Sequence, residues 1–297
     1  MRRGLTVLLT VSIAACLLPG AAAAQEAPIC LKVKKKLSDD HDVWKGRNDR
    51  DSVTGLRGKD RMDGRDGNDR VNGGRDNDVV KGGAGNDVVC GGRGSDKLYG
   101  GPGDDTIYGE EENDKIYPGP GNDTVLGSAG DDRIYGWAEV GGEIVDDGKD
   151  VLDGGFNDDV IEAGGADKLL GFTHNDTLST KTPQIAPKLM DGGGNDDLIF
   201  GSDAGDRIRG GINGQDELYG AGGNDEISGG DNNDKLFGQL GDDELFGEED
   251  LDALDGGPGD DICDGGEGED TGRDCEQEKS IPRVMPSFAW GTEDLSR

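Results

Sequence analysis

The chain has 297 residues, of which 56 are glycine, 31% are hydrophobic and only 5% are aromatic, a small apolar share for a compact domain. Its formal net charge is −33, with no basic block to compensate, which argues against a nucleic-acid partner and against adhesion to anionic lipid. Low hydrophobicity with high charge is typical of a chain that stays disordered in water unless something cationic completes it.

Residues 1–24 have the pattern of a secretory signal peptide. Arg2 and Arg3 form a basic start, and a short apolar run and three alanines precede Gln25. The stretch IAAC, which ends at Cys16, resembles a bacterial lipobox and offers a lipid-anchored alternative. No second apolar stretch is long enough to span a bilayer. We therefore expect a secreted, extracellular chain with no membrane span, and rank the lipid anchor at Cys16 second.

Four cysteines follow the signal peptide, and in an oxidising compartment we expect them to pair. Cys263 and Cys275 are close in sequence and bracket the last repeat, so a bond between them would clamp the C-terminal end. Cys30 and Cys90 would then tie the N-terminal segment or cap, residues 25–45, to the first repeats. Since four cysteines allow three pairings, this connectivity is a hypothesis.

From Gly46 the chain follows a nine-residue repeat, G-G-x-G-x-D-x-U-x, in which U is a large apolar residue. The first block of repeats covers residues 46–135. Position six is aspartate in every unit of this block: Asp51, Asp60, Asp69, Asp78, Asp87, Asp96, Asp105, Asp114, Asp123 and Asp132. Position eight is always apolar: Val53, Met62, Val71, Val80, Val89, Leu98, Ile107, Ile116, Val125 and Ile134. Two independent rules kept in register over so many units indicate a true structural repeat.

The repeat resumes after a degenerate unit or loop at residues 136–149. A second block covers 150–179, an insertion covers 180–191, a third block covers 192–273, and a tail covers 274–297. Position six in these later blocks is again aspartate: Asp150, Asp159, Asp167, Asp176, Asp197, Asp206, Asp216, Asp225, Asp234, Asp243, Asp252, Asp261 and Asp270. The tail could be a cap or a disordered end, and the sequence does not decide between them.

Each unit divides into a turn and a short strand. Glycines at positions one, two and four permit positive φ, and the last three residues alternate polar, apolar and polar. One such strand cannot bury its apolar side chain alone, whereas stacked copies can. Because two units make one coil, unit n should lie against unit n+2. The sequence therefore predicts an all-β fold, a right-handed parallel β-roll with a thin aliphatic core between two stacks of strands.

This stacking places carboxylates in rows along each edge of the roll, where they repel one another. Aspartate oxygens and turn carbonyls are hard ligands, which suit Ca²⁺ with its six to eight oxygens and loose geometry. Mg²⁺ requires a tighter octahedron, and softer metals prefer His or Cys. We therefore predict multiple calcium ions as cofactors, with the position-six aspartates as metal ligands. A merely solvated acidic surface would not explain the strict placement of these residues.

Over residues 46–273 the repeat resembles the RTX, or haemolysin-type, calcium-binding repeat, in which the same glycines, aspartate and apolar residue recur every nine residues. The resemblance implies that Ca²⁺ lies between successive turns on each edge, held by position-six aspartates and backbone carbonyls, and that the chain folds when it meets calcium outside the cell. Units beginning at Gly46, Gly109 and Gly247 lack glycine at positions two and four, so we expect weaker sites there. The N-terminal signal differs from the C-terminal export signal of many members.

No catalytic motif accompanies the repeat. The sequence contains neither HExxH nor GxSxG, and no long non-repeat segment could house a catalytic fold. The two histidines, His41 and His174, lie in polar stretches where we expect them to be solvated. The prediction is a protein that is not an enzyme.

Tyr99, Tyr117 and Tyr135 occupy position nine of alternate units, each two residues after Lys97, Lys115 or Arg133. The spacing predicts a tyrosine ladder beside a basic stripe on one face. The favoured interpretation of the ladder is that cross-strand stacking of the rings stabilises an exposed sheet. The other interpretation is a contact face for glycans or a partner protein.

From the sequence alone we expect a secreted calcium-binding repeat protein that acts as a structural and binding module. The alternative is a cell-surface or matrix adhesin that presents a glycan- or protein-binding face to extracellular glycans or surface proteins. A less favoured alternative is an accessory module of a polysaccharide-modifying enzyme.

Overall fold

The structure, a computed structural model, describes Cys30 and residues 35–140, 143–145, 148–164, 167–181 and 189–279. The predicted signal peptide with Cys16, most of the predicted insertion and most of the tail lie outside the described residues. Within these ranges no helix is long and apolar enough to cross a membrane.

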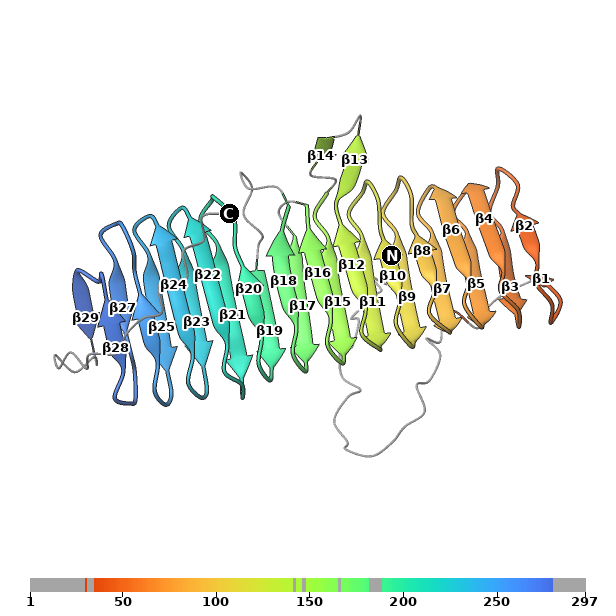
Figure 1. Ribbon diagram of the computed structural model, residues 1–297. Coiled ribbons are helices and arrows are strands. Elements are labelled where there is room, and N and C mark those ends of the chain that lie inside the picture. Colours follow the sequence, from red (N-terminus) through yellow and green to blue (C-terminus); the bar gives the residue numbers. More distant parts are fainter. Residues whose placement is uncertain are drawn as a thin grey trace, which may run out of the picture.

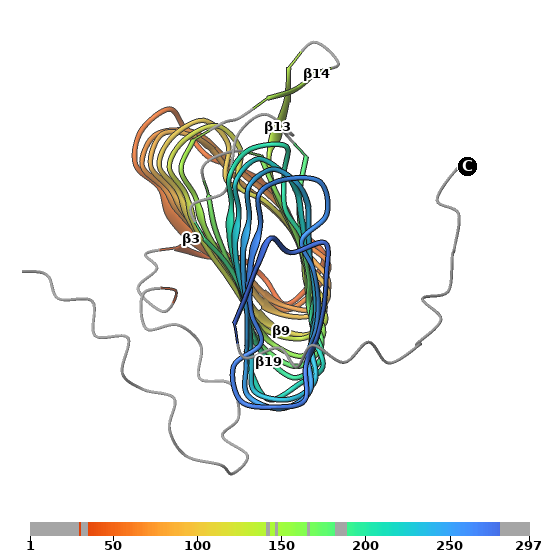
Figure 2. The same cartoon turned by 90° about the vertical axis from the view of Figure 1, so that its left-hand side faces the viewer.

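The chain coils into an elongated solenoid whose strands alternate between two parallel sheets (Figure 1). Viewed along its length, the coil is flattened, with one sheet on each side (Figure 2). The all-β parallel solenoid predicted from the repeat is confirmed. Sheet 1 has 14 strands. In spatial order they are β1 (Lys35–Lys36), β3 (Ser52–Leu56), β5 (Arg70–Arg75), β7 (Val88–Arg93), β9 (Thr106–Glu111), β11 (Thr124–Ala129), β15 (Val151–Phe156), β17 (Lys168–Thr173), β19 (Leu189–Gly194), β21 (Arg207–Ile212), β23 (Glu226–Gly230), β25 (Glu244–Glu248), β27 (Ile262–Asp264) and β29 (Gln277–Lys279).

Sheet 2 has 13 strands and faces sheet 1 across the core. Its strands are β2 (Val43–Lys45), β4 (Arg61–Asp66), β6 (Val79–Ala84), β8 (Lys97–Tyr99), β10 (Lys115–Tyr117), β12 (Arg133–Gly136), β16 (Val160–Ala163), β18 (Thr177–Thr180), β20 (Leu198–Phe200), β22 (Glu217–Gly222), β24 (Lys235–Leu240), β26 (Ala253–Asp255) and β28 (Thr271–Arg273). Many strands in both sheets exceed the three residues predicted, because pairing continues into the glycine positions of the next unit, as between Gly74 and Gly92.

Each strand pairs with the strand one coil away, as the period predicts. Val125 lies opposite Ile107, and Ile116 lies opposite Leu98, so residues 18 apart are neighbours. The degenerate unit at 136–149 contains the antiparallel hairpin of β13 (Ala138–Val140) and β14 (Glu143–Val145), which projects from the solenoid in Figure 1. The register resumes beyond it, since Thr124 of β11 pairs with Val151 of β15.

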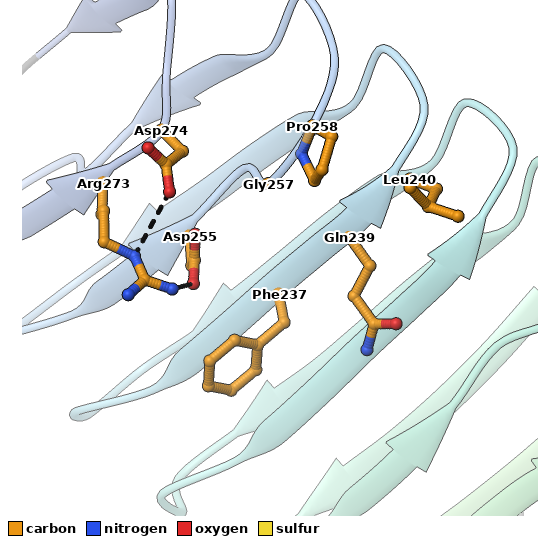
Figure 3. Close-up of a pocket in the computed structure, with 8 residues that line it drawn as sticks. All are labelled: Phe237, Gln239, Leu240, Asp255, Gly257, Pro258, Arg273 and Asp274. Carbon is orange, nitrogen blue, oxygen red and sulfur yellow. Dashed lines mark hydrogen bonds and ion pairs between the residues drawn. The ribbon is translucent and has the colours of Figure 1, made fainter. Parts of the chain in front are cut away.

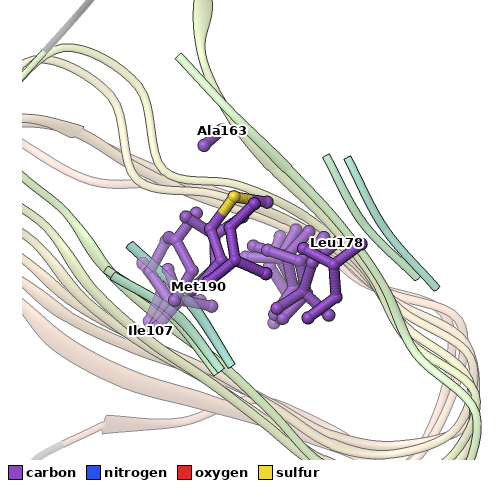
Figure 4. Close-up of a cluster of buried hydrophobic side chains, with 14 of the residues drawn as sticks. Ile107, Ala163, Leu178 and Met190 are labelled. Atoms are coloured by element: carbon purple, nitrogen blue, oxygen red, sulfur yellow. The ribbon is translucent and has the colours of Figure 1, made fainter. Parts of the chain in front are cut away.

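The core consists of the position-eight side chains from both sheets. Leu98, Ile107, Val125 and Leu178 are completely buried, and Figure 4 shows such side chains in two facing files. Burying one Val, Ile or Leu contributes about 1.5–3 kcal/mol, so a single unit stabilises little, and the fold depends on many coils stacked together. The predicted core positions are confirmed.

Two disulfides join the ends of the solenoid to its coils. Cys30 bonds Cys90 on β7, with their Cα atoms 6.2 Å apart, and Cys263 on β27 bonds Cys275, with Cα atoms 5.9 Å apart. Both predicted pairings are confirmed. The main-chain carbonyl of Cys30 also accepts a hydrogen bond from the Asn72 amide (3.3 Å), which adds a second contact between the N-terminal segment and sheet 1.

Replacing one leucine of the core tests this account of packing. We expect Leu98→Ala to lower the free energy of unfolding by about 2–5 kcal/mol, because it removes a fully buried side chain and leaves a cavity. Leu251→Ala, at a position 52% exposed, serves as the control and should cost far less. Denaturant unfolding measured on the oxidised protein in calcium compares the two, and equal losses would contradict the assignment of the core.

Candidate functional site

The position-six aspartates end the turns along both edges of the solenoid. Edge 1, formed by the turns that lead into sheet 1, carries Asp51, Asp69, Asp87, Asp105, Asp123, Asp150, Asp167, Asp206, Asp225, Asp243 and Asp261. Edge 2, formed by the turns that lead into sheet 2, carries Asp60, Asp78, Asp96, Asp114, Asp132, Asp159, Asp176, Asp197, Asp216, Asp234, Asp252 and Asp270. All are buried except Asp51, which is partly exposed.

One oxygen of each carboxylate joins the coils together. The main-chain N–H of Asp87 donates to Oδ1 of Asp105 (2.7 Å), and the N–H of Asp96 donates to Oδ1 of Asp114 (2.8 Å). The same bond recurs along edge 2 as far as Asp252 and Asp270 (3.0 Å). The aspartates therefore form hydrogen-bonded ladders parallel to the solenoid axis, a role that the sequence pattern alone did not indicate.

The other oxygen, Oδ2, is buried in most units without a hydrogen-bond donor. Among the described residues, it accepts no hydrogen bond in Asp60, Asp69, Asp78, Asp87, Asp96, Asp105, Asp114, Asp123, Asp132, Asp159, Asp176, Asp197, Asp225, Asp234, Asp243, Asp252, Asp261 and Asp270. Leaving one such buried acceptor unsatisfied costs about 1–3 kcal/mol, and more when it is charged. A feature repeated in so many turns calls for a positively charged partner.

In most units a main-chain carbonyl of the next coil lies beside the same position-one glycine as Oδ2. A Cβ atom built on Gly64, at position one, would lie 2.5 Å from Oδ2 of Asp69 and 2.2 Å from the carbonyl oxygen of Gly82. On edge 2, a Cβ on Gly91 would meet Oδ2 of Asp96 at 2.5 Å and a carbonyl oxygen at 2.7 Å. Two oxygens thus converge beside the position-one glycine, where a larger side chain would displace them.

Glycines at positions two and four let neighbouring turns approach through their backbones. A Cβ on Gly101 would lie 1.8 Å from the carbonyl oxygen of Gly83, and both residues have positive φ. In the unit beginning at Gly109, Glu110 and Glu112 take the same left-handed conformation, with φ of 85° and 75°. That conformation costs a non-glycine residue about 1–2 kcal/mol, so the stack imposes its turn on this unit.

Burial and mutual repulsion disfavour the charged form of these carboxyls. Burial, together with a smaller contribution from neighbouring carboxylates, raises the pKa of Asp96 to about 8 and the pKa of Asp114 to about 9, although the main-chain hydrogen bond opposes the shift. On edge 1, burial and the carboxylates of Asp123 and Asp87 raise the pKa of Asp105 to about 8. Folding near neutral pH without a cation therefore requires these carboxyls to take up protons, which costs free energy because they are ionised in the unfolded chain.

At three predicted ligand positions Oδ2 accepts a hydrogen bond from the chain itself. Oδ2 of Asp206 accepts hydrogen bonds from the N–H and the hydroxyl of Ser202 (2.6 and 3.1 Å). Oδ2 of Asp51 accepts the N–H of Arg47 (2.7 Å), and Oδ2 of Asp167 accepts the N–H of Gly164 (3.2 Å). In these turns the chain itself supplies the donor, so the need for a cation is weaker. Serine in place of glycine at position two was the available signal for Asp206.

The donor set fits a hard cation held mainly by the backbone. Within the described ranges no three His, Cys, Asp or Glu side chains come together to hold a metal ion. Each turn instead offers a single carboxylate with adjacent carbonyl oxygens, as in Asp69 Oδ2 beside the carbonyl of Gly82. Oxygen ligands with loose geometry suit Ca²⁺. The residues that would hold it are the position-six aspartates and the turn carbonyls of adjoining coils.

Aromatic side chains form ladders on the outer face of sheet 2. Tyr117 stacks on Tyr99 and on Tyr135, with ring centroids 5.1 and 4.9 Å apart, which confirms the predicted ladder. A second ladder, in which Tyr219 stacks between Phe200 and Phe237 at 5.0 and 4.8 Å, was missed although its residues also occupy position nine. His41 and His174 are exposed, as expected.

A hollow of about 310 Å³ lies beside Phe237, the last ring of the second ladder. Figure 3 shows the residues that line it. Phe237, Gln239 and Pro258 line it, and Arg273 pairs there with Asp255 and, at 3.5 Å, with Asp274. No position-six aspartate lines this hollow, although Gln239 and Pro258 belong to the edge 1 turns that end in Asp243 and Asp261.

Comparison with known proteins agrees with the repeat. The profile of the family described as "RTX calcium-binding nonapeptide repeat (4 copies)" matches residues 38–71, 45–80, 63–98, 81–116, 91–125, 117–138, 211–245 and 237–271. No curated protein matches the sequence. One matching solved structure is that of a hyperactive, Ca²⁺-dependent, β-helical antifreeze protein from an Antarctic bacterium; it is 20% identical, the match covers 85% of this chain and 84% of that chain, and the TM-score is 0.33.

The raised pKa values predict how the metal-free chain responds to pH. Because the carboxyls of Asp96 and Asp105 have a pKa of about 8 when folded, against 3.8 as the ordinary value, the folded state binds more protons between these limits. Its stability is therefore greatest below the ordinary pKa and is lost as pH rises through the folded pKa. We expect metal-stripped protein to gain β-sheet circular dichroism as pH falls from about 8 to about 5. A loss of β signal over that range would contradict the assignment.

Proposed function

The chain belongs to the RTX calcium-binding nonapeptide repeat family, and from this premise we propose that it is a secreted module whose β-solenoid folds on binding Ca²⁺ outside the cell. The observation that carries the proposal is the buried Oδ2 atom without a donor, which recurs along both edges beside a converging carbonyl. Calcium at these positions would neutralise the carboxylates and join consecutive coils.

Calcium would act on folding because the site exists only when coils are stacked. Oδ2 of Asp69 and the carbonyl of Gly82 come from adjoining coils and are far apart in an extended chain. Since the ligands assemble only in the folded chain, binding energy becomes folding energy. The metal-free chain, with its net charge of −33, would remain expanded until it meets millimolar calcium.

The extracellular location belongs to the proposal and is supported by two features. The N-terminal pattern around Arg2 and Arg3 is that of a signal peptide, and the two disulfides suit an oxidising compartment. Low free calcium inside the cell would keep the chain unfolded there, and the calcium outside would fold it.

A second candidate function is that of an adhesin that presents a binding face. The observation in its favour is the pair of aromatic ladders on the outer face of sheet 2, at Tyr99, Tyr117 and Tyr135 and at Phe200, Tyr219 and Phe237. Calcium folding would then serve to assemble the face. The two functions are compatible, because one concerns the edges of the solenoid and the other a flat side.

Two adjacent aspartates provide a matched test of the calcium proposal. Asp105 is buried with Oδ2 unsatisfied, whereas Asp104 is exposed and its carboxylate accepts hydrogen bonds from Asn122. In a circular-dichroism titration we expect the wild-type protein to change from coil-like in chelator to β-rich in millimolar Ca²⁺. Asp105→Asn should raise the midpoint calcium concentration several-fold, and Asp104→Asn should leave it near the wild-type value. A β-rich spectrum that chelator does not change would contradict the proposal.

A further inference from the structure

Three basic side chains lie in a row on the outer face of sheet 2. Lys97 on β8, Lys115 on β10 and Arg133 on β12 occupy directly paired positions on consecutive strands, and all three are exposed. Like charges placed directly opposite on neighbouring strands are destabilising. No ion pair joins any of the three to an acidic residue in the described part of the chain. In a chain with a net charge of −33, such a row is unexpected.

Elsewhere on the solenoid, some basic side chains have acidic partners across the strands, whereas others at position seven, Arg61, Arg70 and Lys168, lie opposite valine and form no ion pair among the described residues. Arg207 pairs with Glu226 (2.5 Å), Lys235 with Glu217 (3.7 Å) and Arg93 with Glu111 (2.9 Å). Each of these pairs occupies a directly opposed register position. These repeats can therefore place acids opposite bases, and Lys97, Lys115 and Arg133 are distinguished because three unpaired cations lie directly opposite one another on consecutive strands.

The tyrosine ladder runs parallel to this row, two residues further along each strand. Tyr99, Tyr117 and Tyr135 stack with interplanar angles of 11° and 12°, so each ring covers its neighbour and presents mainly its edge and hydroxyl outward. The ammonium of Lys81 lies 5.2 Å from the Tyr99 ring centroid and adds a fourth cation at one end. The face thus offers a line of cations beside a line of phenol hydroxyls, both repeating at the strand spacing.

We propose that this face, defined by Lys97, Lys115, Arg133 and the adjoining tyrosines, binds a linear acidic polysaccharide that carries one carboxylate on each sugar ring. The chain of such a polymer would run along the solenoid axis. Its carboxylates would meet the cations and its hydroxyls the phenol groups. A hexuronate ring is about as long as the distance between neighbouring strands, about 4.8 Å, so successive rings can follow successive strands in register. The proposal deepens the adhesin candidate and rests on the calcium-folded solenoid of the proposed function.

The overall negative charge does not prevent this contact. At physiological ionic strength charges separated by more than about 8 Å are largely screened, so the local row decides the interaction. Calcium bound along the two edges would also remove most of the repulsion from the position-six carboxylates. A single file of charges on a flat sheet suits a single extended chain better than a nucleic-acid duplex or a bilayer.

The test compares oligosaccharide binding by matched variants in millimolar calcium, after circular dichroism has shown each to be β-rich. The probes are a galacturonate hexamer and, as the neutral control, a maltose-series hexamer. The triple variant Lys97→Gln, Lys115→Gln, Arg133→Gln should bind galacturonate at least about 10-fold more weakly than the wild type. Lys235→Gln, which removes an equivalent but paired cation, should change affinity less than about twofold. Added salt should weaken wild-type binding, and the maltose hexamer should not bind.

The outcomes separate this proposal from the one on which it rests. If the wild-type protein is β-rich in calcium but does not bind galacturonate, the polysaccharide proposal is overturned and the proposal of calcium-dependent folding stands. The polysaccharide proposal is also overturned if the triple variant still binds galacturonate as the wild type does. Equal binding of the neutral hexamer, of single-stranded DNA or of anionic vesicles would overturn it as well. A wild type that stays coil-like in calcium overturns the proposed function and this inference with it.

Discussion

The structure depends on a carboxylate that folding buries in most of its described turns. Oδ1 of each regular position-six aspartate accepts an N–H from the preceding coil, while Oδ2 remains without a donor, as in Asp105 and Asp114. Burying a charge without a partner is so costly that such a group normally neutralises or finds a counter-ion. Here the carboxylates lie in rows along both edges, so each row needs counter-ions. The coils can stack only when those ions are present in solution.

The remaining features of the repeat follow from that arrangement. Glycine at position one leaves room for Oδ2 and the converging carbonyl, and glycine at positions two and four lets the turns touch through their backbones. The strand that follows contributes one buried side chain per unit, such as Leu98 or Ile107, so hydrophobic burial alone gives each unit little stability. The disulfides of Cys30 with Cys90 and of Cys263 with Cys275 hold the two ends, where a coil has a neighbour on one side only.

Periodicity made much of this predictable. A period of nine with two units per coil determines which residues are neighbours, so the register, the core file and the ladder at Tyr99, Tyr117 and Tyr135 could be anticipated before any coordinates. The disulfides did not follow from the period, and their pairing was a hypothesis from the closeness of Cys263 and Cys275 in sequence. The edge geometry could not, because the pattern shows that an aspartate is present and does not show which oxygen finds a donor. Ser202 illustrates the limit: the sequence shows a serine at position two in place of glycine, but its hydrogen bonds to Asp206 depend on the local turn. The left-handed Glu110 is likewise imposed by its neighbours in the stack.

Locating the ions would test the central claim most directly. In a crystal structure of the mature protein grown with calcium, we predict anomalous scattering peaks in rows along both edges, each within about 2.3–2.6 Å of a position-six Oδ2 and of carbonyl oxygens from adjoining coils. The row on edge 1 should be weak or absent at Asp206, where Ser202 already satisfies the carboxylate. A folded solenoid in saturating calcium with no ion beside Oδ2 of Asp105 or Asp114 would contradict the claim that calcium completes the fold.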